Sequence, residues 1–417
     1  MATLTESFYV RVNKDGSIIF TQDILKKFGI TPDSNLRIEL DQNKIQIFPN
    51  IHSLAKVYIE PTSRCNLSCQ TCIRNTWKEP MGEMDLEIFD KLIEQLKDFD
   101  NLQTVMFGGF GEPTFHKDIL YMIKKVKSLG VKTEIITNGT LLNETFIRGL
   151  IKNGLDTLWV SFDGTNDESF ESIREGASFN NIIDNLKMLK RLNTDGKHNI
   201  EIGISFVAMK KNIKDLKDIR KLALAVGAKR VYISNVLPYD RKMQDQILYE
   251  NLLIEKSPYF STDEIFISLP GMDLNETTGE IIYSLFRNNK NISLLTNTIS
   301  TTTSTCRFIK DRCTFIRWDG MVSPCMGLLH SYNTFIHGYE RNVKEYTFGN
   351  ISDTDLKSIW DSKEYMDFRE KVERFNFSPC HRCGGCDLIK NNNEDCYGNS
   401  FPVCGACLWA HGVIQCP

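Results

Sequence analysis

A group of three closely spaced cysteines constrains this chain more than any other feature. Cys65, Cys69 and Cys72 have the spacing C-x3-C-x2-C and follow an apolar run at residues 57–59. Three thiolates are one ligand short of a complete tetrahedral or cubane site, and metal sites that keep an open position are typically catalytic. The spacing therefore predicts a [4Fe–4S] cluster whose open iron can bind a small molecule. The alternative is a structural zinc site, for which the sequence offers no fourth ligand nearby.

The composition and the first residues limit the classes of protein to which this chain can belong. A length of 417 residues suggests two or three domains. No segment of the sequence approaches a membrane span, and the N-terminus lacks the basic and apolar regions of a secretory signal, so we expect a cytoplasmic protein without a membrane partner. The formal net charge of −3 gives no general attraction to nucleic acid.

The remaining cysteines are gathered at the other end of the chain. Of 13 cysteines, none lies between residues 73 and 305, and ten lie between Cys306 and Cys416. Because the cytosol keeps thiols reduced, clustered cysteines there indicate metal binding rather than disulfides. Three cysteines in the first group and ten in the second predict one cluster with an open iron and two fully ligated clusters, with two thiols left over.

The middle of the chain alternates between strands and amphipathic helices. Candidate strands lie at residues 56–60, 102–107, 132–137, 157–162, 202–209 and 230–236. Candidate helices begin near Asp85, Asn143 and Asp215. Repeated βα units imply a parallel sheet with helices outside it, here a full or partial barrel. Ligands of such folds bind at the carboxyl ends of the strands.

Polar and glycine-rich motifs follow the ends of these predicted strands in chain order. The candidate ligand-binding residues are Gly109, Gly111, Glu112, Asn138, Ser161, Asp163 and Arg174. Glycines let a backbone approach a ligand closely, and Glu112 offers a carboxylate to a cationic group. Ser161 and Asp163 could bind a ribose, and Arg174 could pair with a carboxylate. Each residue alone is compatible with an ordinary turn or strand end, but the ordered set indicates a binding site.

This ordered set, over roughly residues 55–236, resembles the radical S-adenosylmethionine (radical SAM) superfamily. The resemblance implies that Cys65, Cys69 and Cys72 hold a [4Fe–4S] cluster whose open iron is chelated by the amino and carboxylate groups of SAM. One electron, from a donor such as ferredoxin or flavodoxin, then cleaves SAM to methionine and a 5′-deoxyadenosyl radical that abstracts a substrate hydrogen. The family often has an aromatic residue before the third cysteine; here it is Thr71.

The resemblance also implies roles for the residues at the strand ends. Glu112 and the backbone of residues 109–111 would meet the amino group of SAM. Ser161 and Asp163 would face its ribose, Arg174 would meet its carboxylate, and Asn138 would lie in the same site.

The C-terminal cysteines resemble the SPASM extension of radical SAM enzymes, which carries two auxiliary [4Fe–4S] clusters. C-x2-C pairs alone also fit zinc ribbons. The candidate ligands are Cys306, Cys313, Cys325, Cys380, Cys383, Cys386, Cys396, Cys404, Cys407 and Cys416. Cys306, Cys313 and Cys325 match the first-cluster side, and Cys380 and Cys383 match the start of the second part. The other spacings depart from the family pattern, so the full ligand sets and the two spare thiols stay open.

The sequence of residues 1–50 predicts a small β-rich unit with a hairpin at residues 8–20, a short helix at 23–29 and a second hairpin at 36–48. The unit resembles the AbrB-like swapped-hairpin fold, whose members interlock as dimers, which implies a homodimer and DNA binding. However, this segment contains six Lys/Arg and six Asp/Glu, so it lacks the excess positive charge of a DNA-binding surface. Docking of a protein or peptide is the alternative.

The predicted fold is therefore α/β: a partial (β/α)6 TIM-like barrel of the radical SAM type, with an N-terminal β-rich module and a C-terminal Cys-rich iron–sulfur domain. We divide the chain into an AbrB-like module at 1–50, a radical SAM core at 51–236, a linker or bridging region at 237–305 and a SPASM-type domain at 306–417.

SPASM-type enzymes mostly modify peptides or proteins. Sulfatase-maturing relatives usually place Asp after the cysteine that matches Cys325, and the residue here is Met326, which argues against formylglycine formation. Residues 59–64 and 395–417 resemble maturases of tungsten-containing aldehyde ferredoxin oxidoreductases, which implies a tungstoenzyme or its partner peptide as substrate. The alternatives are a thioether- or crosslink-forming enzyme acting on a ribosomal peptide, and an iron–sulfur redox sensor that binds DNA through residues 1–50.

Overall fold

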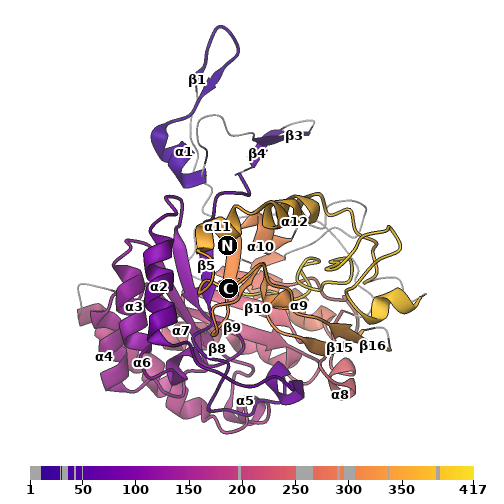
Figure 1. The fold of residues 1–417 in the computed structure, drawn as a ribbon. Coiled ribbons are helices and arrows are strands. Elements are labelled where there is room, and N and C mark those ends of the chain that lie inside the picture. The colour runs from indigo at the N-terminus through magenta and orange to yellow at the C-terminus, as the bar shows by residue number, and fades with distance from the viewer. Residues whose placement is uncertain are drawn as a thin grey trace.

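The computed structural model of this chain shows a rounded body of strands and helices from which the N-terminal hairpins project (Figure 1). It describes residues 11–28, 30, 36–41, 44–48, 50–195, 199–249, 266–288, 292–294, 306–336, 338–381 and 386–417.

Six parallel strands form the centre of the molecule, and each pairs with the next one in chain order. They are β5 (Lys56–Ile59), β6 (Thr104–Phe107), β7 (Lys132–Thr137), β8 (Thr157–Ser161), β9 (Glu201–Ala208) and β10 (Arg230–Asn235). All residues of β5 and β6 are buried, as expected of parallel strands that are covered on both faces. The predicted partial barrel is confirmed.

The connecting helices each bury an apolar face against this sheet and lie on its outer side (Figure 1). They are α2 (Leu86–Leu96), α3 (Ile119–Lys127), α4 (Glu144–Lys152), α5 (Asp167–Glu171), α6 (Phe179–Asp195) and α7 (Ile219–Val226). In α2 the buried residues are Phe89, Leu92, Ile93 and Leu96, which share one face at helical spacing. Helix α7 ends at Gly227, whose φ of +77° favours glycine.

The central sheet continues beyond these six strands at both edges. Strands β11 (Phe266–Leu269) and β12 (Ile292–Leu294) extend it in parallel beyond β10. At the other edge, β13 (Cys313–Ile316) pairs in parallel with β5, and β14 (Val322–Ser323) returns antiparallel to β13. The sheet thus crosses the boundaries predicted at residues 236 and 306, and the division into domains stays a prediction.

The C-terminal part packs against the same sheet. Its elements are α10 (Arg307–Lys310), β15 (Tyr332–Ile336), β16 (Tyr339–Val343), α11 (Leu356–Trp360) and α12 (Lys363–Arg374). Two helices precede it in the chain, α8 (Arg241–Gln244) and α9 (Gly279–Asn288). Single 3-10 turns are η1 (Ile73–Thr76), η2 (Pro113–Phe115), η3 (Ile213–Asp218), η4 (Met326–Leu328) and η5 (Asp387–Lys390). The last residues return to the core, where the Tyr58 hydroxyl donates to the Pro417 carbonyl over 2.8 Å.

The N-terminal segment forms two small antiparallel hairpins and one helix, as expected from its sequence. They are β1 (Arg11–Val12) with β2 (Ile18–Ile19), α1 (Gln22–Phe28), and β3 (Arg37–Asp41) with β4 (Lys44–Phe48). Residues 1–10, and residues 29, 31–35, 42–43 and 49, lie outside the described part. The AbrB-like assignment stays a prediction.

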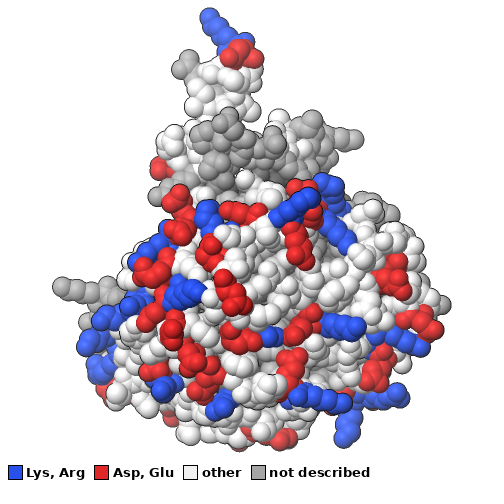
Figure 2. All heavy atoms as spheres, in the orientation of Figure 1, with Lys and Arg blue, Asp and Glu red and all other residues white. Residues whose placement is uncertain are grey.

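Acidic and basic side chains are interspersed on the face drawn in Figure 2, which shows no extended basic area there. None of the helices in the described ranges has the length and apolar character needed to cross a bilayer.

Candidate active site and iron–sulfur ligands

Cys65, Cys69 and Cys72 lie in the loop between β5 and η1, at the carboxyl end of the sheet. All three side chains are partly exposed. The Leu67 N–H donates to the Cys65 sulfur over 3.4 Å, and Arg74 Nε donates to the Cys72 sulfur over 3.2 Å. Burial raises the pKa of Cys65, and the hydrogen bond from the Leu67 N–H opposes that rise.

The three thiols of this loop are a donor set that suits an iron–sulfur cluster with one open iron. Burial, together with the nearby Cys65 and Cys72, raises the pKa of Cys69 to about 11 against the opposing effect of Arg174. No three cysteine sulfurs in the described ranges lie within 4.8 Å of one another. Sulfurs around one zinc ion, with Zn–S distances of about 2.3 Å, would be about 3.8 Å apart.

The predicted glycine-rich loop lies directly over the cysteine loop. A Cβ atom on Gly111 would lie 1.9 Å from the Thr62 carbonyl oxygen, and the Glu112 N–H donates to the Arg64 carbonyl over 2.8 Å. Gly109 has a φ of +107°, a conformation that L side chains rarely adopt. The glycines are therefore required for the close approach of the two loops.

Glu112 is buried, and its carboxylate is surrounded by donors. It accepts the Thr114 N–H over 3.0 Å, the Thr137 hydroxyl over 2.7 Å and the Asn138 N–H over 2.6 Å. Burial raises the pKa of Glu112 against the opposing effect of these hydrogen bonds. The side chain thus ties the loop after β6 to the end of β7, and its predicted contact with the amino group of SAM stays a prediction.

Asn138 connects the end of β7 to the cysteine loop. Its amide nitrogen lies 3.6 Å from the Cys65 sulfur and donates to the Asn66 side-chain oxygen over 2.9 Å. Ser161, the last residue of β8, is half-buried. Of these two predicted ligand-binding residues, the structure places Asn138 in contact with a predicted cluster ligand.

Asp163 and Arg174, for which the sequence predicts separate contacts with SAM, are paired with each other. Arg174 Nε lies 2.9 Å from Asp163 Oδ2, and the Asp163 side chain is fully buried. The Val207 N–H donates to the other Asp163 oxygen over 3.0 Å. Burial opposes the charge of Arg174, but Asp163 and Cys69 outweigh it and raise the pKa of the guanidinium. The pair therefore lies beside the cysteine loop.

Three C-terminal cysteines line one cavity, and Cys306 lies near them. Cys325, Cys404 and Cys407 line it together with Tyr332, Arg341 and Trp409. Burial, followed by the nearby Cys407, Cys306 and Cys404, raises the pKa of Cys325 far above its ordinary value. Burial and Cys407 likewise raise the pKa of Cys306 to about 12.

A second group lies around Cys380. Burial is the main cause that raises the pKa of Cys380, and the nearby Cys396 adds to it. The Ser378 hydroxyl lies 3.0 Å from the Cys396 sulfur. Cys386, which follows six residues after Cys380, is exposed, and Cys383 lies outside the described residues.

Cys313 and Cys416 do not line the cavity of Cys325, although Cys313 lies near enough to Cys306 for that thiol to raise its pKa. Cys313 begins β13 and is buried, and burial raises its pKa, whereas the nearby Lys56 lowers it. Cys416 is half-buried, with its pKa raised by burial and lowered by a hydrogen bond from Trp409.

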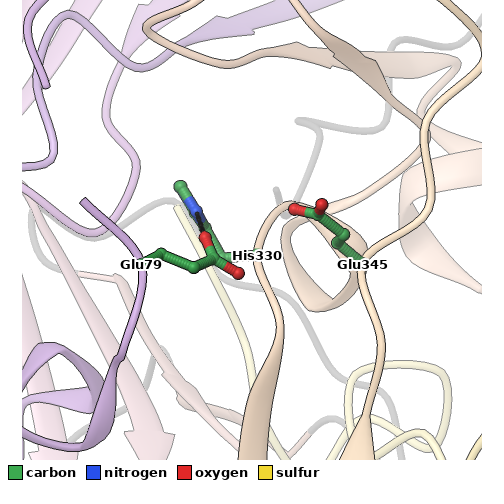
Figure 3. A group of neighbouring side chains, drawn as sticks. All are labelled: Glu79, His330 and Glu345. Atoms are coloured by element: carbon green, nitrogen blue, oxygen red, sulfur yellow. Dashed lines mark hydrogen bonds and ion pairs between the residues drawn. The ribbon is translucent and has the colours of Figure 1, made fainter. Parts of the chain in front are cut away.

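One polar group around His330 carries no local signal in the sequence. His330 lies between the carboxylates of Glu60 and Glu79, and Glu345 lies opposite them on the C-terminal part (Figure 3). Glu60 and His330 are 270 residues apart in the chain, so no local pattern could reveal their contact.

The radical SAM superfamily model matches residues 59–223, and the SPASM iron–sulfur cluster-binding domain matches residues 306–387. The chain is 32% identical over 368 residues to the "Tungsten-containing aldehyde ferredoxin oxidoreductase cofactor-modifying protein" of Pyrococcus furiosus, which covers 87% of this chain and 96% of the relative. It is 29% identical over 181 residues to a PqqA peptide cyclase of Granulibacter bethesdensis, covering 43% of this chain and 46% of the relative.

The fold is similar to that of a solved structure. The crystal structure of Streptococcus suis SuiB bound to S-adenosylmethionine aligns with a TM-score of 0.54 and 20% sequence identity, over 83% of this chain and 73% of SuiB.

Proposed function

This chain belongs to the radical SAM superfamily and carries a SPASM domain, and on that premise we propose that it is a maturase of a tungsten-containing aldehyde ferredoxin oxidoreductase. The observation that carries this proposal is the 32% identity to the cofactor-modifying protein of P. furiosus over 96% of that protein. The similarity includes both the core and most of the Cys-rich part, and the superfamily consists of enzymes, which argues against the redox-sensor alternative.

The residues of the core suit the binding of a cluster and SAM. Cys65, Cys69 and Cys72 would hold a [4Fe–4S] cluster, which, when bound, supplies the electron that cleaves SAM to a 5′-deoxyadenosyl radical. Asn138 places an amide donor beside the Cys65 sulfur. Such a donor stabilises negative charge on the sulfur and orients the ligand. Gly111 keeps the loop that would meet the SAM amino group against the cysteine loop.

We assign the auxiliary clusters from the two groups of C-terminal cysteines. Cys306, Cys325, Cys404 and Cys407 would hold one cluster, since three of them line one cavity and the fourth lies near them. Cys380, Cys383, Cys386 and Cys396 would hold the other. Cys313 and Cys416 are then the two spare thiols. The alternative keeps Cys313 with Cys306 and Cys325, as the family spacing suggests.

The second candidate function is modification of a ribosomally made peptide. It is favoured by the similarity to the PqqA peptide cyclase. That similarity covers 43% of this chain and therefore bears on the chemistry of the core more than on the substrate. A peptide or protein remains the predicted substrate class in both proposals, and a ferredoxin or flavodoxin the predicted electron donor.

We propose that the N-terminal segment mediates dimerisation. Its two hairpins expose Ile18, Ile19, Ile38 and Ile45, with 42% to 65% of each side chain accessible. Isolated two-stranded hairpins are marginally stable and usually need a partner for their apolar face. A second copy of the same segment would cover them. Ile38→Asp with Ile45→Asp should convert a dimer to a monomer in light scattering, and an unchanged mass would contradict this.

The substrate proposal is tested by anaerobic incubation of the reduced protein with SAM and a tungsten-containing aldehyde ferredoxin oxidoreductase that was produced without this protein. We expect release of 5′-deoxyadenosine to increase with the oxidoreductase, and mass spectrometry to detect a modified cofactor or subunit. Protein with Cys65→Ala is the control. Stimulation by a short peptide but not by the oxidoreductase would favour the second candidate instead.

A further inference from the structure

His330 joins the C-terminal part to the core through two carboxylates. Its Nε2 lies 2.9 Å from Glu60 Oε2, and its Nδ1 lies 2.9 Å from Glu79 Oε2. The exposed fractions of the side chains are 3% for His330, 1% for Glu60 and 30% for Glu79. The contact with Glu60 therefore lies inside the protein, where a lost hydrogen bond is costly.

This geometry favours a protonated imidazole. An ionised carboxylate can only accept hydrogen bonds, so both ring nitrogens must donate, and an imidazole does so only as the imidazolium. Burial lowers the pKa of His330, but the charges and hydrogen bonds of Glu60 and Glu79 outweigh it and raise the value to about 9. The same contact with His330 lowers the pKa of Glu79.

Glu60 carries this contact to the glycine-rich loop. Its second oxygen, Oε1, accepts the Phe110 N–H over 3.0 Å. A Cβ atom on Gly109 would lie 2.5 Å from Glu60 Cγ, so the loop packs directly on this side chain. One carboxylate thus binds His330 with one oxygen and the loop backbone with the other.

Two aromatic rings enclose the imidazole. The Trp77 ring lies 4.3 Å from His330 and the Phe110 ring 5.9 Å, measured between centroids. Trp77 and Phe110 also pack edge to face at 5.4 Å. Aromatic faces favour a cation over a neutral ring, and Phe110 belongs to the same loop that Glu60 holds.

The other charged groups around His330 are Arg317 and Glu345. Ligand atoms of Glu79, His330 and Glu345 lie within 4.8 Å of one another, which is also the geometry of a divalent cation site (Figure 3). However, both nitrogens of His330 already bind carboxylates, and Glu345 pairs with Arg317. The contacts therefore favour an imidazolium over a metal ion.

We propose that His330 is a positioning residue for SAM binding, which acts from the C-terminal part through Glu60 to hold the glycine-rich loop in its binding conformation. This inference rests on the proposed radical SAM function of the core. It makes the affinity for SAM depend on how the C-terminal part is seated against the core.

The test compares SAM affinity of the anaerobic, cluster-loaded wild type with that of His330→Gln, which keeps a hydrogen-bond donor but cannot carry the positive charge. We expect the dissociation constant for SAM to rise about 10-fold, with kcat at saturating SAM within about twofold. His52→Gln is the matched control, because His52 also joins the two parts, through Arg369 and Glu370. It should leave SAM affinity unchanged.

Two further measurements separate positioning from a general loss of structure. In a double-mutant cycle, the variant with both His330→Gln and Glu60→Gln should bind SAM almost as well as His330→Gln alone, since His330 acts through Glu60. The ratio of wild-type to His330→Gln affinity should be largest below pH 9 and approach one above it. Additive effects, or a ratio that does not depend on pH, would overturn the proposal.

The outcomes also distinguish this inference from the proposed function. A wild type that binds no SAM would contradict the function itself. A wild type that binds SAM as tightly as His330→Gln would contradict only the role of His330. Mn²⁺ binding, followed by electron paramagnetic resonance and abolished by His330→Gln, would assign a metal site and overturn the proposal as well.

Discussion

Arg174 and Asp163 form a buried ion pair at the carboxyl end of the sheet, with Arg174 Nε 2.9 Å from Asp163 Oδ2. The guanidinium is 12% exposed and the carboxylate is not exposed. The positive charge of Arg174 also opposes the rise that burial causes in the pKa of Cys69, so the pair links the end of β8 to the cysteine loop. A ligand that binds either residue must compete with the other.

Arg174→Gln should destabilise the protein by about 3 kcal/mol or more, because it leaves Asp163 charged, buried and unpaired. Thermal unfolding of anaerobic protein measures this. Adding Asp163→Asn should recover part of the loss, since the unpaired charge is then removed. A single substitution that costs less than about 0.5 kcal/mol would show that the pair does not support the fold.

Gly111→Ala should prevent the glycine-rich loop from seating on the cysteine loop. The new methyl group would lie 1.9 Å from the Thr62 carbonyl oxygen, so one of the two backbones must move. We expect lower stability and loss of SAM binding, measured by equilibrium dialysis. Gly279→Ala is the matched control, because a Cβ there meets nothing within 4 Å. Equal behaviour of the two variants would contradict the close approach.

Stability should depend on pH through His330. Its pKa rises from 6.5 to about 9 on folding, so its contribution is fully present below pH 6.5 and is lost as the pH rises through 9. The free energy of unfolding of the wild type should exceed that of His330→Gln by about 3 kcal/mol at pH 6. The difference should shrink above pH 9.

The control for this titration is His52→Gln. Burial, followed by the charge of Arg369, lowers the pKa of His52, so its contribution has the opposite sign and is lost as the pH falls. Chemical denaturation at several pH values measures both differences. A wild-type advantage over His330→Gln that persists unchanged above pH 9 would argue against the imidazolium.

Iron content should follow the proposed grouping of the C-terminal cysteines. Three cubanes give about 12 irons per chain. Cys404→Ala and Cys396→Ala should each fall to about 8, whereas Cys313→Ala and Cys416→Ala should keep about 12. Iron and sulfide assays on anaerobic protein measure this. Loss of four irons in Cys313→Ala would instead support the grouping of Cys313 with Cys306.

Local patterns in the sequence predicted much of the core. The spacing of Cys65, Cys69 and Cys72 is a signal contained in eight residues, and the βα alternation follows from hydrophobic periodicity. The Asp319-Gly320 pair is a local pattern typical of a hairpin turn, and the structure has the β13–β14 hairpin there. The family and its cofactors were therefore predictable, and the comparisons confirm them.

Contacts between distant segments could not be predicted. The parallel pairing of β13 with β5 joins residues more than 250 positions apart, and both strands are buried on all sides and carry no directional signal. The contact of His330 with Glu60 depends on that pairing, because it brings the C-terminal part beside β5. Asp163 and Arg174 are close in sequence, but their pairing depends on the path of the loop between them.

The most direct measurement of the central claim is 5′-deoxyadenosine formed from SAM by the reduced, oxygen-free protein, with Cys65→Ala alongside. The proposed function predicts at least one equivalent of 5′-deoxyadenosine from the wild type. It predicts none from Cys65→Ala, although that variant should keep about 8 irons in its auxiliary clusters. Equal product from both proteins, or none from a fully loaded wild type, would contradict it.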